Sequence, residues 1–341
     1  MSYPVVLIPG DGVGPEVTEA ARQIVDATGV SIAWKIHYAG GEAVERFGSP
    51  LPDETLAAIS AAGTALKGPL ATASGTGFRS VNVEIRKRLD LYANFRPARS
   101  MDGIRSRYAD VDVIVIRENT EGLYSGLEHE VVPGVVESLR IVTKRASERI
   151  ARFAFETARK YGREKVTCVH KANILKLSDG LFLDTARRIA GEFSDIEFDD
   201  CIVDAAAMKL VIDPTQFDVL VMENLFGDIL SDLCSGLVGG LGVTPSANIG
   251  ENVAVFEAVH GTAPDIAGQQ LANPTALVLS AALMLRHLGE ADAAERVETA
   301  VRRVIADGEW LTVDLGGTAS TSDFTEAVIE QLDVVPSVAS N

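Results

Sequence analysis

The sequence predicts an α/β fold built on a mostly parallel β-sheet. Short apolar runs typical of buried strands alternate along the chain with amphipathic stretches typical of helices. The 341 residues are 47% hydrophobic and 23% charged, which is enough chain to bury a large core. Two domains are the expectation for this length.

The first predicted unit is a strand, a tight turn and a helix. Residues 5–8 are apolar, a glycine-rich segment follows at 9–14, and Pro15 stands where a helix would begin. The other apolar runs predicted to be strands are 111–116, 166–169 and 217–222. The amphipathic stretch 146–161 predicts a helix between two of them.

Residues 129–143 have the pattern of two strands around a Pro133-Gly134 turn. The sequence offers this hairpin no obvious helix to pack against. It is therefore either an arm that forms a dimer or a hairpin on the protein surface.

Composition excludes several classes of protein. A formal net charge of −17 argues against binding to a nucleic-acid backbone. Three cysteines without metal-ligand spacing indicate reduced thiols. The longest apolar stretch, 276–285, is shorter than the roughly 20 residues that cross a membrane, and no secretory signal is found. We expect a cytoplasmic protein of bacterial or archaeal type, or a mitochondrial matrix protein whose transit peptide has been removed.

Common catalytic motifs are missing from the sequence. Gly10-x-Gly12-x-Gly14 has its third glycine one position too early for a Rossmann fingerprint, and residues 31–40 lack the expected acidic residue. Walker loops, His-Glu-x-x-His helices and Gly-x-Ser-x-Gly elbows are also absent from the sequence. The chemistry is therefore expected in other segments.

One such segment is cationic within an acidic chain. Arginines and hydrogen-bonding residues fill 79–88, and Arg96, Arg99 and Arg117 follow. Asn82 and Arg86 are four residues apart and would share a helix face, so that amide and guanidinium groups could bind one polyanion. A solvated basic helix face explains residues 79–88 equally well.

A second segment is acidic. Asp228 and Asp232 are spaced i, i+4 near a predicted helix start, which fits a Mg²⁺ or Mn²⁺ site or charges that complement the helix dipole. Near a metal, Lys171 and Tyr124 could transfer protons. The glycine-containing loop 260–268 either approaches a cofactor closely or forms ordinary turns.

Taken together, segments 89–97, 116–122 and 260–268 resemble the isocitrate/isopropylmalate dehydrogenase family, and within it the NAD-dependent isocitrate dehydrogenases. The resemblance extends from Ile8 to Gly317. It implies a fold that is not a Rossmann fold, with a large domain on the cofactor side (1–98 plus 245–341) and a small domain (99–244). The small domain would carry the metal ligands, the dimer interface and a clasp arm at about 126–145.

The same resemblance implies a substrate site and a cofactor site. The isocitrate ligands would be Thr72, Ser80, Asn82, Arg86, Arg96 and Arg117. Ser80 and Asn82 would face the distal group of the substrate, where hydroxyl and amide suit a carboxylate better than an isopropyl group. The NAD site would comprise His260, Gly261, Thr262, Ala263, Pro264, Asp265, Ile266 and Asn273. The carboxylate of Asp265 would repel the additional phosphate of NADP, and NADP-linked relatives tend to carry Lys-Tyr at the 265–266 pair.

The implied metal ligands are Asp204, Asp228 and Asp232, with Asp204 and Lys171 supplied by the partner in a homodimer. The implied reaction is that of the tricarboxylic acid cycle. Hydride passes from C2 of isocitrate to NAD and gives oxalosuccinate, and loss of CO₂ leaves an enolate that the metal stabilises. Lys171 would assist removal of the hydroxyl proton, and Tyr124 would protonate the enolate.

The sequence departs from the family pattern at two positions. Relatives often have Pro after Thr72, and some NAD-linked relatives have Pro at the position of Glu223. The alternative functions are a homoisocitrate or 3-isopropylmalate dehydrogenase and, from a different class, a non-catalytic regulatory subunit of an NAD-dependent isocitrate dehydrogenase. The joint presence of Tyr124, Lys171 and the three aspartates argues against the regulatory subunit.

Overall fold

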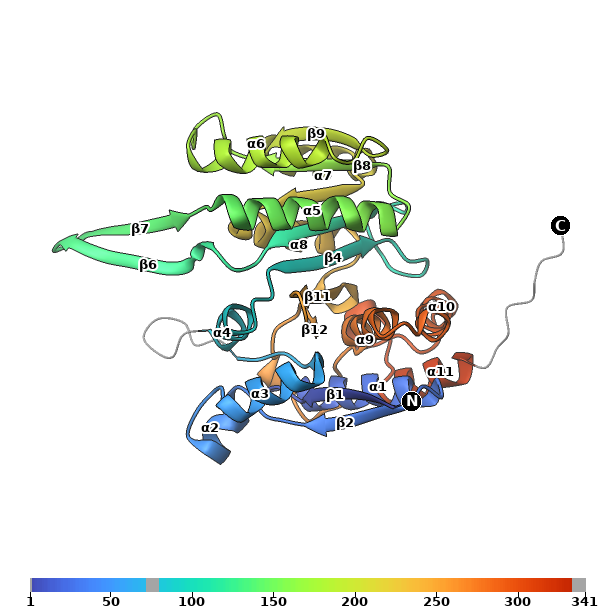
Figure 1. Cartoon of the computed structure of the whole chain (residues 1–341). Coiled ribbons are helices and arrows are strands. Elements are labelled where there is room, and N and C mark those ends of the chain that lie inside the picture. Colours follow the sequence, from blue (N-terminus) through green and yellow to red (C-terminus); the bar gives the residue numbers. More distant parts are fainter. Residues whose placement is uncertain (1, 72–79, 333–341) are drawn as a thin grey trace, which may run out of the picture.

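The computed structural model describes residues 2–71 and 80–332, and Figure 1 shows its arrangement. One ten-stranded sheet runs through the molecule in the order β2-β1-β3-β12-β11-β4-β5-β10-β8-β9. Its strands in chain order are β1 (Tyr3–Ile8), β2 (Ile32–Ile36), β3 (Thr64–Lys67), β4 (Ala93–Arg99), β5 (Asp112–Glu118), β8 (Lys165–His170), β9 (Glu197–Ile202), β10 (Val219–Met222), β11 (Pro245–Ile249) and β12 (Ala254–Ala258).

The sheet is parallel at both ends and antiparallel in the middle. The antiparallel pairs are β12 with β11, β11 with β4, and β4 with β5, and the other six pairings are parallel. The predicted mostly parallel α/β fold is therefore confirmed. The proposed division at residues 98 and 244 stays a prediction.

Helices cover the sheet at both ends (Figure 1). In chain order they are α1 (Gly14–Ala27), α2 (Gly41–Phe47), α3 (Asp53–Ala62), α4 (Val81–Arg88), α5 (Lys144–Lys160), α6 (Ser178–Ala190), α7 (Val203–Ile212), α8 (Asn224–Leu237), α9 (Thr275–His287), α10 (Ala291–Asp307) and α11 (Thr321–Leu332). Helix α5 shows how the local sequence specifies a helix. Its buried face comprises Ala146, Ile150, Ala154 and Ala158 at helical spacing, and the hydroxyl of Thr143 accepts from the Ala146 N–H at its start.

The predicted strands are found with small shifts at their ends. All four residues of β10 are buried, as expected of a strand covered on both faces, but it begins at Val219 because Pro214–Gln216 forms a 3₁₀ turn before it. Cys168, Cys201 and Cys234 are free and buried, which confirms the expectation of reduced thiols. In the described part of the chain, no helix is long and apolar enough to span a membrane.

The predicted hairpin is present and projects from the body of the molecule (Figure 1). It consists of β6 (Gly122–Val132) and β7 (Val135–Ile141), joined at Pro133-Gly134, where Gly134 has φ +83°. The hairpin therefore spans 122–141 rather than 126–145, because residues 144 and 145 already belong to α5. Its large apolar side chains that are exposed are Leu123, Leu127, Val131, Val132, Val135, Val136 and Leu139.

Candidate active site

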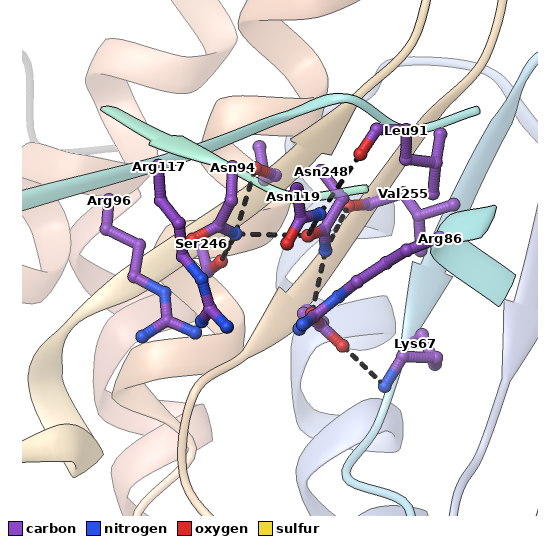
Figure 2. A network of polar contacts seen from close by, with 12 residues as sticks. Lys67, Arg86, Leu91, Asn94, Arg96, Arg117, Asn119, Ser246, Asn248 and Val255 are labelled. Carbon is purple, nitrogen blue, oxygen red and sulfur yellow. Dashed lines mark hydrogen bonds and ion pairs between the residues drawn. The ribbon is translucent and has the colours of Figure 1, made fainter. Parts of the chain in front are cut away.

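A row of polar side chains lies on one face of the sheet, where neighbouring strands bring residues of matching parity side by side. Register pairs Asn94 with Arg117 across β4 and β5, and Asn94 with Asn248 across β4 and β11. Arg96 lies two positions after Asn94, and Asn119 lies two positions after Arg117, so both face the same side of the sheet. The buried amides are joined directly, since Asn94 and Asn119 both donate to Asn248 Oδ1, at 3.0 and 2.9 Å (Figure 2).

Three arginines converge beside this row. Arg96 and Arg117 point the same way from β4 and β5, and Arg86 approaches from α4 (Figure 2). Arg96 and Arg117 are 5% and 1% exposed. Burial lowers the pKa of Arg96, and Arg86 lowers it as well. Burial together with Arg86 and Arg96 lowers the pKa of Arg117 to about 10. Repulsion between buried cations is relieved when a polyanion binds among them.

The acid pair of α8 lies against the same arginines. Arg117 pairs with Asp228, Arg96 Nη1 lies 3.1 Å from Asp232 Oδ1, and the hydroxyl of Tyr124 contacts Asp228. The guanidinium of Arg117 also lies 5.1 Å from the centre of the Tyr124 ring. Five of the predicted site residues, from β4, β5, β6 and α8, are therefore brought into one cluster.

Close approach of α8 to β5 requires a glycine at position 227. A Cβ added to Gly227 would lie 2.4 Å from Arg117 Cγ. We expect Gly227→Ala to displace Arg117, to raise the KM for the anionic substrate and to destabilise the fold by about 1–3 kcal/mol, measured by urea unfolding and steady-state kinetics. Gly236→Ala on the same helix is the matched control, because its Cβ would meet open space. Equal behaviour of the two variants would contradict this packing argument.

The acid pair also fits a divalent cation. Burial raises the pKa of Asp232, and the adjacent Asp228 carboxylate raises it as well while Arg96 opposes the rise. A cation between the two carboxylates would favour their ionised forms, and carboxylate oxygens suit Mg²⁺ or Mn²⁺. Among residues 2–71 and 80–332 no three His, Cys, Asp or Glu side chains gather to hold a metal.

Lys171 and Asp204 lie together but apart from this acid pair. Lys171 follows β8 directly, Asp204 lies in the first turn of α7, and Lys171 Nζ forms an ion pair with the Asp204 carboxylate. The hydrogen bond from Lys171 lowers the pKa of Asp204. Their side chains are 27% and 68% exposed, so this pair faces outward on the isolated chain.

The predicted cofactor loop is built against the first glycine-rich turn. Val13 N–H donates to Thr262 O, and a Cβ on Gly12 would lie 2.0 Å from that oxygen, so position 12 requires glycine. The buried Nε2 of His260 has no hydrogen-bond partner, and burial lowers the pKa of this histidine. Asp265 in the same loop is exposed, and the Asn273 amide donates to Asp314 at 3.0 Å. The free imidazole nitrogen and the exposed carboxylate of this loop would suit a ligand with both donor and acceptor groups, such as a dinucleotide.

The structure places some of the remaining predicted residues near the site and others away from it or outside its described range. Ser80 and Asn82 stand at the start of α4, and the Asn82 amide oxygen is buried without a hydrogen-bond partner. Thr72 and Arg79 lie outside the described residues. Arg99 was wrongly grouped with the cationic cluster. It is three residues from Arg96 on β4, so its side chain leaves the opposite face of the sheet and lies 3.7 Å from Asp112.

Sequence reasoning missed two charged residues that support Arg86. Glu257 on β12 accepts from Arg86 at 3.0 Å and pairs with the 2%-exposed side chain of Lys67 at 2.7 Å (Figure 2). Its Oε1 also accepts from the Asn248 amide at 2.7 Å. A lone Lys or Glu within an apolar strand was the available signal, since such residues are seldom buried without a partner.

Fold and site together define an α/β protein with a buried cluster of arginines beside a pair of carboxylates. The family model described as isocitrate/isopropylmalate dehydrogenase matches residues 4–328. The chain therefore belongs to the isocitrate/isopropylmalate dehydrogenase family.

Individual relatives show which members of the family the chain resembles. The chain is 53% identical over 327 residues to isocitrate dehydrogenase [NAD] catalytic subunit 5, mitochondrial, of Arabidopsis thaliana, covering 96% of this chain and 87% of that protein. It is 52% identical over 335 residues to the alpha subunit of the human mitochondrial enzyme, covering 96% and 90%. The crystal structure of isocitrate dehydrogenase from Methylococcus capsulatus superposes with a TM-score of 0.94 at 54% identity, covering 97% and 99%. The chain resembles NAD-type members of the family. The mitochondrial names of the two relatives are compatible with the matrix alternative.

Proposed function

We propose that the protein catalyses the NAD-dependent oxidative decarboxylation of isocitrate to 2-oxoglutarate and CO₂. The observation that carries the proposal is the convergence of Arg86, Arg96 and Arg117 beside Asp228 and Asp232. A tricarboxylate offers enough negative charge to pair with three arginines, and planar guanidinium groups suit bidentate carboxylate binding.

Ser80 and Asn82 favour isocitrate over its homologues. The amide oxygen of Asn82 is buried without a hydrogen-bond partner, which is costly, so the amide would bind a polar substituent of the substrate. Rotation of the amide exchanges its oxygen and nitrogen, so that the nitrogen can donate to a carboxylate. An isopropyl group would leave this amide unsatisfied. Isocitrate is therefore preferred to 3-isopropylmalate, and homoisocitrate is distinguished from isocitrate by its length alone.

The protein residues have separate roles in the proposed reaction. The arginines would hold the carboxylates, and Lys171 would assist removal of the proton of the C2 hydroxyl. Bound NAD would supply the acceptor for the hydride of C2. CO₂ is then lost from oxalosuccinate, and the Tyr124 hydroxyl protonates the enolate carbon to give 2-oxoglutarate. The contact between Tyr124 and Asp228 supports this role, because it holds the phenol beside the acid pair.

Asp228 and Asp232, with Asp204 of the partner subunit, would hold Mg²⁺ or Mn²⁺. When bound, such an ion supplies Lewis-acid polarisation of the carbonyl and enolate oxygens. His260 to Ile266 and Asn273 would hold NAD. The exposed Asp265 carboxylate would accept hydrogen bonds from the adenosine ribose and repel the additional phosphate of NADP.

The proposed active form is a homodimer whose sites are shared. The outward-facing Lys171–Asp204 pair is accompanied by exposed apolar side chains, of which Ile174, Leu177 and Ile212 are 68%, 91% and 66% exposed. The apolar hairpin 122–141 is exposed as well. A second copy of the chain would cover these surfaces and would receive Lys171 and Asp204. Sedimentation velocity at micromolar concentration is expected to show a dimer, and a monomer at that concentration would contradict this part of the proposal.

The proposed activity is tested by NADH formation at 340 nm with Mg²⁺ or Mn²⁺ and isocitrate, 3-isopropylmalate or homoisocitrate, followed by the best substrate with NADP. Turnover of isocitrate with NAD is expected to exceed the other combinations. Faster turnover of 3-isopropylmalate would contradict the Asn82 argument. Inactivity with all three substrates in the presence of Mg²⁺ or Mn²⁺ would favour the non-catalytic regulatory subunit.

A further inference from the structure

A buried ion cluster lies at the base of the β6–β7 hairpin and belongs to none of the sites described above. Arg140 on β7 donates through Nη1 to Asp179, and its Nη2 lies 3.4 Å from Glu223 Oε1. The side chains of Arg140, Asp179 and Glu223 are 13%, 2% and 6% exposed. The guanidinium also lies 5.1 Å from the centre of the Phe226 ring. Ion clusters this deeply buried are costly to assemble, so their geometry is strongly specified.

The first carboxylate of the cluster holds the segment that begins at Lys171. Asp179 lies in the first turn of α6, and its Oδ2 accepts the backbone N–H of Lys171 at 2.6 Å. Its other oxygen accepts from Arg140. Asp179 therefore fixes where the chain leaves β8, and with it the origin of the Lys171 side chain.

The second carboxylate holds the start of α8. Glu223 is the N-cap of this helix, and its carboxylate accepts from Phe226 N–H at 2.9 Å and Leu225 N–H at 3.2 Å. Asp228 and Asp232 lie in the following turns of the same helix. Glu223 therefore sets the position of the helix that carries the acid pair.

Arg140 supplies the positive charge between these two carboxylates. Burial raises the pKa of Glu223, Arg140 and the helix N–H groups lower it, and Asp179 raises it. The two carboxylates thus repel one another, and without the guanidinium they would face each other in a poorly solvated site.

We propose that Arg140 is a positioning residue that fixes the Lys171 segment and the Asp228 helix relative to one another. The inference rests on the proposed function, in which Lys171 serves the partner's site while α8 serves its own. Arg140 then links the two active sites of the dimer through one ion cluster. Glu223 supplies one half of the link.

Amide hydrogen exchange of the metal-free protein tests the link without using activity. Arg140→Met is expected to speed exchange about tenfold in peptides covering both 171–177 and 223–228, because each segment loses a charge-assisted anchor. Arg163→Met is the matched control, since Arg163 is 20% exposed and also bridges two carboxylates, those of Asp112 and Asp218, away from the active site. Its exchange in both segments is expected to match the wild type.

Glu223→Gln weakens the contact of Arg140 with Glu223 and leaves its contact with Asp179 in place. It provides a second test if Arg140→Met folds poorly. It is expected to speed exchange at 223–228 while leaving 171–177 unchanged. Titration with Mn²⁺ followed by electron paramagnetic resonance is expected to show weaker binding to both variants by about tenfold, and none of this loss in Arg163→Met. Sedimentation velocity is expected to show that Arg140→Met remains dimeric.

Wild-type exchange in both segments of Arg140→Met, or faster exchange in only one of them, would overturn the inference. Dissociation of the variant into monomers would also overturn it, because the hairpin would then act through assembly. These outcomes are independent of the substrate panel. An inactive wild type with the expected exchange pattern would refute the proposed function alone, and an active wild type with an unchanged Arg140→Met would refute the link alone.

Discussion

Tyr124→Phe is expected to lower kcat for isocitrate by about 10²- to 10⁴-fold with little change in KM, because the general acid is removed while the substrate arginines stay in place. Phenylalanine retains the ring beneath Arg117, so the fold should be preserved. The role of Tyr124 as proton donor predicts a second effect. The variant should also lose decarboxylation of added oxalosuccinate, measured by 2-oxoglutarate formation.

Tyr161→Phe is the matched control for this prediction. Tyr161 stacks on Phe95, with ring centres 5.4 Å apart, on the side of the sheet away from the acid pair. Its variant should retain wild-type kcat. A Tyr124→Phe enzyme that decarboxylates oxalosuccinate at the normal rate would show that another group protonates the enolate.

Glu257→Gln is expected to destabilise the protein at pH 7 by about 3–5 kcal/mol, the usual cost of removing one partner from a buried ion pair, because Lys67 would stay buried without its counter-ion. Burial raises the pKa of Glu257, but Lys67 and Arg86 outweigh this and hold it well below its usual range. Its stabilising contribution is therefore present above the unfolded-state pKa of about 4.3 and is lost as the pH falls below that value.

The difference in stability between wild type and Glu257→Gln should accordingly shrink on acidification below about pH 4. Urea unfolding across this range measures it. Asp53→Asn is the control. It removes the exposed ion-pair partner of Arg88, a residue on the same helix as Arg86, and should change stability little. A pH-independent difference would show that Glu257 acts through packing rather than charge.

Much of this arrangement followed from the sequence because it depends on local pattern. Buried runs such as 111–116 and the amphipathic stretch 146–161 specify a strand and a helix by their own periodicity. Asp228 and Asp232 share one side of α8 because a helix places residues i and i+4 together. The parity of β4 likewise separates Arg99 from Arg96, a distinction that counting charges alone overlooked.

The supporting ion clusters depend on contacts between distant segments, which periodicity does not encode. Glu257 meets Arg86 across 171 positions of sequence, and Arg140 meets Asp179 across 39. Each residue is an ordinary charged side chain in its local context, and its burial becomes visible only when the strands are assembled. The proposed contribution of Lys171 to the partner's site would be of the same kind, since an isolated chain displays the residue facing outward.

The shared active site is tested most directly with a heterodimer of two inactive variants. Lys171→Met and Asp228→Asn chains carrying different affinity tags are co-expressed, and the mixed dimer is purified through both tags and assayed with isocitrate, NAD and Mg²⁺. If Lys171 acts in the partner's site, both defects fall in one site and the other site is complete, so activity should return to about half of wild type per dimer. If each chain completes its own site, both sites remain defective, and a mixed dimer as inactive as the two parent variants would contradict the shared site.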